Sequence, residues 1–282
     1  MAVTNSITKS TTPKSTGSSI AAFLTKENVQ AQIRDVVGGK NGQRFVSAVV
    51  SAVNNNPDLQ ACTNQSIFSA ALLGEALNLS PSPQLGHYYM VPFNSSSGKV
   101  AQFQLGYKGY IQLALRSGQY KKLNVVAIKD GELIRFDPLN EEIEVNLIED
   151  EDEREQTATA GYYAMFEYTN GFRKAMYWSR AKMERHALKY SKGYQAKKGY
   201  TFWEKDFDGM AYKTMLRQLI SKWGIMSIEM VTAMDSDMAV INEDGTKTYV
   251  DNMDEPETDT QTPTQPQTIV AEPGTVQELN DF

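Results

Sequence analysis

The chain has 282 residues, of which 41% are hydrophobic and 10% aromatic, a composition typical of globular proteins. No apolar run reaches the roughly 18 residues of a membrane span, and the N-terminal stretch lacks the apolar core of a secretion signal. We therefore expect a cytoplasmic protein without a membrane partner. The single cysteine, Cys62, excludes an internal disulfide and a cysteine-cluster metal site.

The formal net charge of −6 hides an uneven distribution. Residues 171–222 carry 13 Lys/Arg against 4 Asp/Glu, and residues 86–136 carry 7 against 2. Residues 137–155 carry 10 acids against one Arg, and residues 229–282 carry 13 acids against one Lys. The chain is thus basic in its middle part, with one acidic loop and an acidic C-terminal tail. Because the local electrostatic potential matters more for binding than the net charge, nucleic acid remains a candidate partner.

The first part of the chain is predicted to be helical. Residues 1–21 are Ser/Thr-rich and have no hydrophobic periodicity, which indicates a disordered arm. Apolar residues at three- and four-residue spacing then predict helices over 26–37, 42–53 and 64–79. Thr63 is the expected N-cap of the third helix.

The pattern then changes to period two. Strands are predicted over 85–93 and 99–105, then a helix over 107–117, then strands over 122–129, 132–136, 159–168 and 172–178. The last two form a hairpin around Asn170-Gly171, and the acidic residues before them are expected to be a solvated loop. Helices over 179–191 and 202–223 follow, with a short one after Gly224. The chain is thus predicted to have an arm (1–21), an α+β domain (22–234) and a disordered acidic tail (235–282).

The sequence offers little to an enzyme. His87 and His186 share no metal-ligand spacing, and no G-x-x-x-x-G-K-[ST] phosphate loop is present. The acidic run 149–153 (EDEDE) would suit a Mg²⁺-dependent nuclease, but contiguous acids are more typical of a solvated segment. We therefore expect no catalytic residue, metal site or cofactor, and leave open whether Mg²⁺ tunes assembly.

The basic residues form stripes along three predicted helices. Each stripe alone is compatible with an ordinary solvated face, but three in one acid-poor region favour a phosphate-binding surface. The stripe of the helix over 179–191 contains Lys182, Arg185, Lys189 and Lys192. That of the helix over 202–223 contains Lys213 and Arg217, opposite the apolar stripe of the same helix. That of the helix over 107–117 contains Lys108, Gln112 and Arg116.

Aromatic residues alternate with these charges. Rings beside cations suit a single strand, whose bases can stack while cations follow the phosphates. The candidates are Tyr107 and Tyr110, which flank Lys108, and Tyr190, Tyr194 and Tyr200 in the segment that also carries Lys197 and Lys198.

Three blocks carry a family resemblance: 80–93 (SPSPQLGHYYMVPF), 104–118 (QLGYKGYIQLALRSG) and 203–219 (WEKDFDGMAYKTMLRQL). With their spacing they resemble the RecT family of phage single-strand annealing proteins, over about residues 20–235. The resemblance implies ATP-independent annealing, assembly into a ring or helical filament, and a phage exonuclease partner. It also implies a Rad52-like core, an antiparallel sheet packed on a long helix, with DNA in a basic groove lined by residues 106–116. Lys108 and Arg116 would contact phosphates there, and the helix of Lys213 and Arg217 would support the groove.

The sequence therefore predicts a non-enzymatic protein that binds single-stranded DNA, forms homo-oligomers and anneals complementary strands in recombination. Its expected partners are single-stranded DNA, the annealed duplex intermediate, a phage exonuclease and a host single-strand-binding protein, and its subunit contacts are expected in 22–79. Two alternatives stay open: a metal-dependent nuclease using 149–153, and a structural protein that binds duplex DNA.

Overall fold

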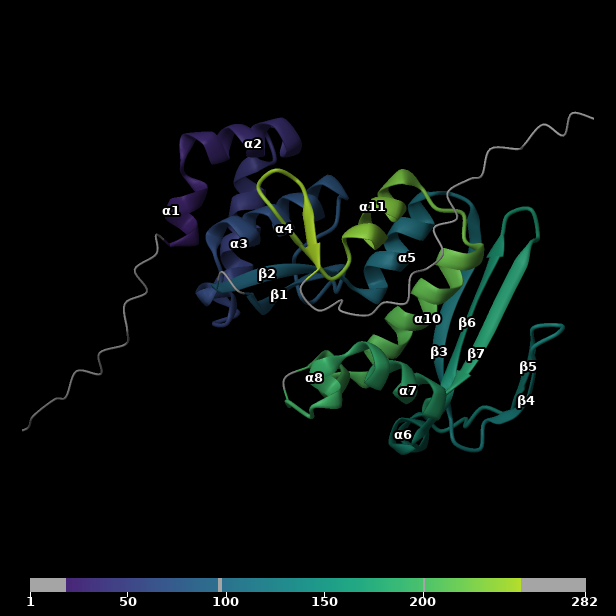
Figure 1. Ribbon diagram of the computed structural model, residues 1–282. Helices are drawn as coiled ribbons and strands as arrows, with labels where there is room; N and C mark the ends of the chain where they lie inside the picture. Colours follow the sequence, from purple (N-terminus) through teal and green to yellow (C-terminus); the bar gives the residue numbers. More distant parts are fainter. Residues whose placement is uncertain (1–18, 96–97, 200, 250–282) are drawn as a thin grey trace, which may run out of the picture. The chain divides into compact units, whose positions relative to one another are not determined.

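A computed structural model describes residues 19–95, 98–199 and 201–249 (Figure 1). The arm and tail predictions therefore lie outside the described residues over 1–18 and 250–282. Helices begin the described chain. Three of them were predicted: α2 (Glu27–Val37), α3 (Gly42–Asn54) and α4 (Asn64–Ala76). Helix α1 (Ile20–Leu24) and the short 3₁₀ helix η1 (Leu59–Ala61) were not, and the first two residues of α1 had been assigned to the arm. Thr63 caps α4 as predicted, because its Oγ1 accepts the Ser66 N–H at 3.4 Å. Among the described residues no helix is both long and apolar enough to cross a membrane.

The first sheet has four antiparallel strands in the order β1-β2-β8-β9. The hairpin of β1 (Tyr88–Ser95) and β2 (Gly98–Leu105) was predicted, and α4 packs against β2. Two strands were not predicted: β8 (Ala239–Ile241) and β9 (Lys247–Tyr249). The boundary expected at residue 234 falls inside α11 (Ile228–Ser236), and regular structure continues to Tyr249. The acid-rich composition hid β8, whose Ala239 is buried beside Phe103 of β2.

The second sheet has the antiparallel order β3-β6-β7, from β3 (Tyr120–Lys129), β6 (Thr159–Tyr168) and β7 (Arg173–Ser179). The long helix α10 (Phe207–Trp223) packs against all three strands. On the other face, Ile128, Tyr163, Met165 and Ala175 form a smaller core under the hairpin of β4 (Leu133–Asp137) and β5 (Glu142–Val145). The predicted fold class, α+β with an antiparallel sheet on a long helix and N-terminal helices, is confirmed.

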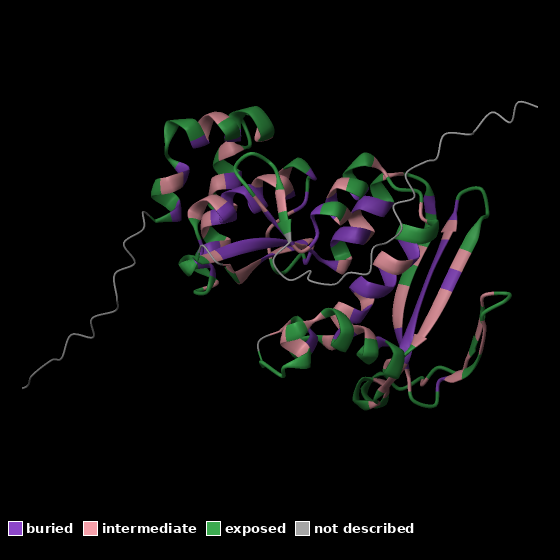
Figure 2. Ribbon diagram, in the orientation of Figure 1, coloured by how far each residue is buried: buried purple, intermediate pink, exposed green. Residues whose placement is uncertain are grey.

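Helix α10 lies in the middle of the core. It contacts the second sheet on one side and α5 (Tyr107–Arg116) on the other, and buried residues concentrate along these elements (Figure 2). The predicted helix over 202–223 is divided into α9 (Phe202–Lys205) and α10, because Asp206 leaves the helical conformation and accepts the Gly209 N–H at 2.9 Å. Such an N-cap fixes where α10 begins.

The acidic stretch is more structured than predicted. Besides β5, it contains α6 (Glu151–Gln156), capped by Asp150. The buried Glu132 ties this segment to the sheet: its carboxylate accepts Arg154 Nε at 2.6 Å and the Lys129 N–H at 2.8 Å. Burial alone would raise the pKa of Glu132, but the hydrogen bonds from Arg154 and from backbone N–H groups outweigh it and lower the pKa. A solvated loop is therefore the wrong description of this segment.

One backbone donor at the outer edge of β7 is occupied by a side chain from the β4–β5 turn. Glu141, in the β4–β5 turn with a φ of 58°, accepts the Ala175 N–H at 2.9 Å and pairs with the Lys174 ammonium. Lys174 in turn lies 4.8 Å from the ring centroid of Trp223. The turn thus occupies a backbone donor that an edge strand would otherwise present to solvent.

Candidate nucleic-acid interface

Helix α7 (Arg180–Tyr190) presents a row of cations. Ser179 begins the helix by accepting the Lys182 N–H at 3.3 Å, and Met183 and Ala187 are its buried residues. The exposed Lys182, Arg185 and Lys189 fall at positions i, i+3 and i+7, which share one side of a helix. The stripe predicted for these three residues is therefore presented to solvent.

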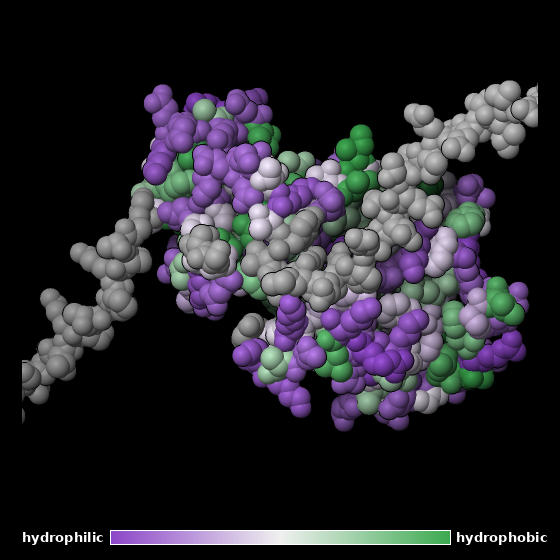
Figure 3. Space-filling view, viewed as in Figure 1, coloured by the Kyte–Doolittle hydropathy of each residue, from purple (hydrophilic) through white to green (hydrophobic). Residues whose placement is uncertain are grey.

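Lys222, in the last turn of α10, adds a cation that the sequence patterns did not connect to α7. Burial lowers the pKa of Lys182, and the positive charges of Lys222 and Arg185 lower it further. The Lys182 ammonium also lies 4.3 Å from the ring centroid of Trp178. Within the described parts of the chain, no ion pair involves Lys182, Arg185, Lys189 or Lys222. We call these four residues the cationic face; Figure 3 shows hydrophilic side chains gathered where α7 and α8 lie.

A cluster of aromatic rings around His186 lies beside these charges. The His186 ring centroid is 4.5 Å from that of Tyr190, 5.6 Å from that of Trp178 and 6.4 Å from that of Trp203. Burial lowers the pKa of His186 to about 4, with smaller contributions from the charges of Arg217 and Lys189. Hence His186 is neutral at pH 7, and the exposed Tyr190 ring beside it is available for stacking.

The lysine-rich segment after α7 departs from the predicted stripe. Ser191 ends α7 and caps the short helix α8 (Lys192–Gln195), so Lys192 does not continue the row. Lys192, Lys197 and Lys198 are exposed. Tyr194 is half-buried, with ring centroids 6.3 Å from Trp203 and 6.2 Å from Phe207. Since its ring packs inward, its predicted role in base stacking is corrected. Tyr200 lies outside the described residues.

Lys213 and Tyr110 are buried rather than presented to solvent as predicted, whereas the Arg217 side chain stays 34% exposed. All three reach the buried Asp237, whose carboxylate accepts Lys213 Nζ at 2.8 Å, Arg217 Nη1 at 2.9 Å and the Tyr110 hydroxyl at 3.4 Å. The Leu105 N–H completes the set at 2.9 Å. Tyr110 is fully buried and Lys213 is 7% exposed, so neither can contact DNA directly.

The physical reason is the position of α10. Polar residues opposite the apolar side of a helix face solvent only when the helix packs on one side. Helix α10 packs on two sides, against the second sheet and against α5. Burial lowers the pKa of Lys213, partly offset by the charge of Asp237, and raises the pKa of Tyr110 well above its ordinary value. No pattern in the sequence singled out Asp237, because it lies among the acids assigned to the tail.

The predicted residues of α5 separate into three groups. Arg116 donates to the carbonyl oxygens of Leu77 at 2.8 Å and Asn78 at 2.6 Å, at the C-terminal end of α4, which is a structural role. Lys108 and Gln112 line a surface hollow of about 290 Å³ beside His87. Burial lowers the pKa of His87, as do the charges of Arg116 and Lys108. Tyr107 packs edge-on against Tyr212 and lines a different pocket.

Two glycines, Gly106 and Gly109, explain why the blocks 80–93 and 104–118 occur together in the sequence: the two segments pack closely against each other. The Gly106 N–H donates to the His87 carbonyl at 2.9 Å. A Cβ atom at Gly106 would lie 2.1 Å from the Gly86 carbonyl oxygen, and one at Gly109 would lie 2.1 Å from the His87 carbonyl oxygen. Only glycine allows the start of α5 to approach the 86–87 backbone this closely.

The residues of the nuclease alternative form no site. The acids of 149–153 are exposed on and before α6. In the parts of the chain that the structure describes, no group of three or more His, Cys, Asp or Glu side chains could hold a metal ion. The structure thus gives the nuclease alternative no support.

The fold and the glycine contact agree with the class that the sequence blocks indicated, an α+β protein with an antiparallel sheet packed on a long helix. The model of the RecT family matches residues 43–258, more than half of the chain, and the chain belongs to the RecT family. It is 41% identical over 235 residues to "Uncharacterized protein YqaK" of Bacillus subtilis (strain 168), covering 83% of this chain and 75% of that protein. It is 29% identical over 226 residues to "Protein RecT" of Escherichia coli (strain K12), covering 78% and 80%. Membership implies single-strand annealing in DNA recombination.

Proposed function

We propose that the chain binds single-stranded DNA along the cationic face, assembles with further copies on the strand, and promotes pairing with a complementary strand without consuming a nucleotide. The observation that carries this proposal is the row of exposed cations Lys182, Arg185 and Lys189 along one side of α7, close enough to Lys222 for their charges to interact. Burial lowers the pKa of Lys182, and the positive charges of Lys222 and Arg185 lower it further. Like charges held together repel each other, and an anion between them would relieve that repulsion. A row of phosphates is the anion that a row of cations fits.

The neighbouring rings favour a single strand over a duplex. Tyr190 is 39% exposed and Trp223 is 42% exposed, beside Lys189 and Lys222 respectively. Bases of a single strand can stack on such rings, whereas the bases of a duplex are already stacked on each other. Lys192, Lys197 and Lys198 extend the positive charge beyond α7, and Lys108 and Gln112 supply further contacts on α5.

The partners follow from the same proposal. Single-stranded DNA and the annealed intermediate would bind the cationic face, and assembly would be a ring or a helical filament. A phage exonuclease would supply the single strand in the bacterial cytoplasm, where a host single-strand-binding protein would compete for it. In this function the protein positions strands and performs no chemistry.

A salt titration tests the proposal. Fluorescence anisotropy of labelled oligo-dT is measured with the parent protein, Lys182→Ala, Arg185→Ala and Lys222→Ala. Each variant should lower the magnitude of the slope of log K against log salt by roughly 0.7, the value per phosphate contact on a single strand. Mixed-sequence oligonucleotides should show the same loss, because phosphates carry no sequence information.

Lys40→Ala is the matched control, since Lys40 is an exposed lysine in the turn between α2 and α3, outside the cationic face. It should keep the parent slope. If all four variants keep that slope, the cationic face is not the DNA-binding surface.

A further inference from the structure

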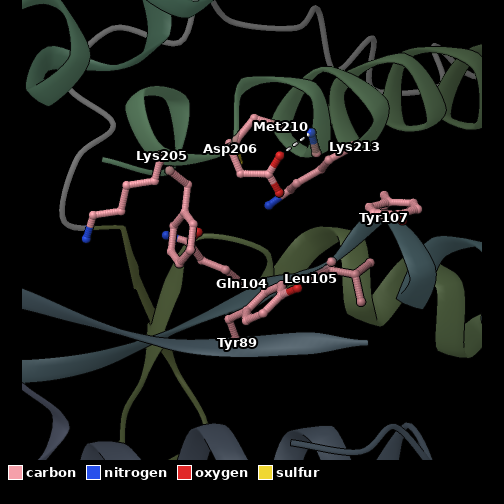
Figure 4. Close-up of a pocket in the computed structure, with 11 residues that line it drawn as sticks. Tyr89, Gln104, Leu105, Tyr107, Lys205, Asp206, Met210 and Lys213 are labelled. Carbon is pink, nitrogen blue, oxygen red and sulfur yellow. Dashed lines mark hydrogen bonds between the residues drawn. The ribbon is translucent and has the colours of Figure 1, made fainter. Parts of the chain in front are cut away.

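A pocket of about 150 Å³ lies between the first sheet and the start of α10 (Figure 4). In Figure 4, Tyr89 of β1 and Leu105 of β2 lie across the pocket from Asp206 and Met210. The three RecT motif blocks and the α9 region all contribute to its walls. Its lining includes Tyr89, Gln104, Leu105, Phe202, Asp206 and Met210.

The size and the walls suit one flat ring. A cavity of roughly 150 Å³ is large enough to hold a benzene molecule. The rings of Tyr89 and Phe202 lie 5.7 Å apart between centroids and are tilted by 39°, so a planar ligand can lie against aromatic faces. Leu105 and Met210 add apolar walls.

The polar groups at the pocket suit the edge of a nitrogen heterocycle. Asp206 is held in place by its N-cap bond, in which one carboxylate oxygen accepts the Gly209 N–H at 2.9 Å. Burial raises the pKa of Tyr89, and the nearby charge of Asp206 raises it further, which places that carboxylate close to the Tyr89 end of the pocket. The Gln104 amide of β2 also lines the pocket and donates to Gln102 Oε1 at 2.9 Å.

The charge of the lining argues against a phosphate as the occupant. The Lys213 ammonium is already paired with Asp237, and the carboxylate of Asp206 offsets the exposed Lys205. A polyanion would gain little inside such a pocket, whereas a neutral ring with N–H and C=O groups would gain stacking and hydrogen bonds. Outside it, Lys108 and Lys205 are exposed and can meet the phosphates on either side of the ring.

We propose that this pocket holds one nucleobase of a bound single strand, turned away from its neighbours, in each copy of the protein. This inference rests on the proposed function, because it assigns a base-binding subsite to the same strand. A base in the pocket has its hydrogen-bonding edge covered and must leave before it can pair. The pocket therefore favours the unpaired strand and is vacated when the complementary strand pairs.

The experiment compares two strands of equal charge. One is oligo-dT, and the other is an oligonucleotide of the same length in which every base is replaced by a stable abasic residue. Stacking of one base on aromatic side chains contributes about 1–3 kcal/mol, or about 5- to 150-fold in affinity. Phe202→Ala should therefore weaken binding of oligo-dT by about five-fold or more and leave binding of the abasic strand within about two-fold of the parent value.

Phe172→Ala is the matched control, because Phe172 is an aromatic residue of comparable exposure (47%, against 38% for Phe202) in the β6–β7 turn and does not line the pocket. It should change neither affinity. Thermal melts check that the variants fold, and Phe202→Leu, which keeps apolar volume without a ring, replaces Phe202→Ala if the latter does not.

The outcomes separate the two proposals. If the parent protein binds neither strand, the proposed function fails. If the parent binds both strands and Phe202→Ala weakens them equally, or weakens neither, the base-binding pocket is overturned while DNA binding stands.

Discussion

Lys213 and Asp237 form an ion pair of 2.8 Å inside the core, between the middle of α10 and the residue that ends α11. The Asp237 side chain is fully inaccessible to solvent, and it also accepts Arg217 Nη1. Two cations on the central helix thus depend on one carboxylate from a segment whose composition indicated disorder. Breaking a buried pair is costly, because it leaves a charge without compensation in a medium of low polarity.

Asp237→Asn should lower the free energy of unfolding by about 3–5 kcal/mol. Denaturant unfolding followed by circular dichroism measures the change. Asp235→Asn is the control: this side chain is 63% exposed in its pair with Lys247, so its loss should cost at most about 1 kcal/mol. Equal effects of the two variants would contradict the role assigned to Asp237. For the same reason, Lys213→Ala should lower stability and leave the salt slope of DNA binding unchanged.

Two truncations should have different effects on stability. Ending the chain after residue 251 removes seven acids and no base, so the melting temperature should stay the same and single-strand binding at low salt should stay equal or become tighter. Ending it after residue 234 also removes Asp237 and β8, and should lower the melting temperature strongly or prevent folding. Thermal melts and anisotropy of both proteins provide the test. A chain ending at 234 that melts like the parent would show that the Asp237 contacts contribute little.

His186 should make stability depend on pH in a defined window. Its pKa is lowered by burial to about 4 from the ordinary value of 6.5, so between these values the unfolded chain binds the proton more readily than the folded one. The associated stability is fully present above pH 6.5 and is lost as the pH falls toward 4. Because the ring is partly exposed, we expect about 2 kcal/mol.

The measurement is a comparison of the parent protein with His186→Phe, by denaturant unfolding at several pH values. The difference in stability between the two should be constant above pH 6.5 and should shift in favour of the variant as the pH falls. Parallel curves across the window would show that His186 keeps an ordinary pKa.

Annealing should not require a nucleotide. The sequence has no phosphate loop, so complementary oligonucleotides should anneal at the same initial rate with ATP, with a non-hydrolysable analogue, or with neither. A fluorescence-quench assay measures these rates. A rate that rises only with ATP would refute the proposed mechanism.

Local patterns predicted much of the fold. The Thr63 cap, the β1–β2 hairpin and the β6–β7 hairpin around Gly171, which has a φ of 87°, depend on residues close together in the sequence. The period of the hydrophobic pattern and the residue types typical of turns predict such local features well. The resemblance of three blocks added the family, which residue patterns alone could not supply.

The main errors about the site concern contacts between distant segments. Helical spacing placed Lys213 opposite an apolar stripe but could not show that α5 covers that side of α10. Composition placed Asp237 in a tail, although its partners on α10 lie 20 and 24 residues earlier in the chain. Likewise, Lys222 lies near the cations of α7 only because α7 and α10 both pack on the second sheet. Of the four residues of the cationic face, the sequence therefore predicted only Lys182, Arg185 and Lys189.

The Glu141 turn limits how copies of this chain can join. A strand with unoccupied backbone donors can accept a strand from another molecule, and proteins crowded along one DNA strand would meet such edges constantly. Here Glu141 accepts the Ala175 N–H and holds Lys174 at the outer edge of β7. Strand pairing is thereby disfavoured at this position of β7, and contacts between neighbouring copies at this edge would have to be made by side chains. Recognition of that kind can be reversed when annealing ends, whereas a continuous sheet would persist.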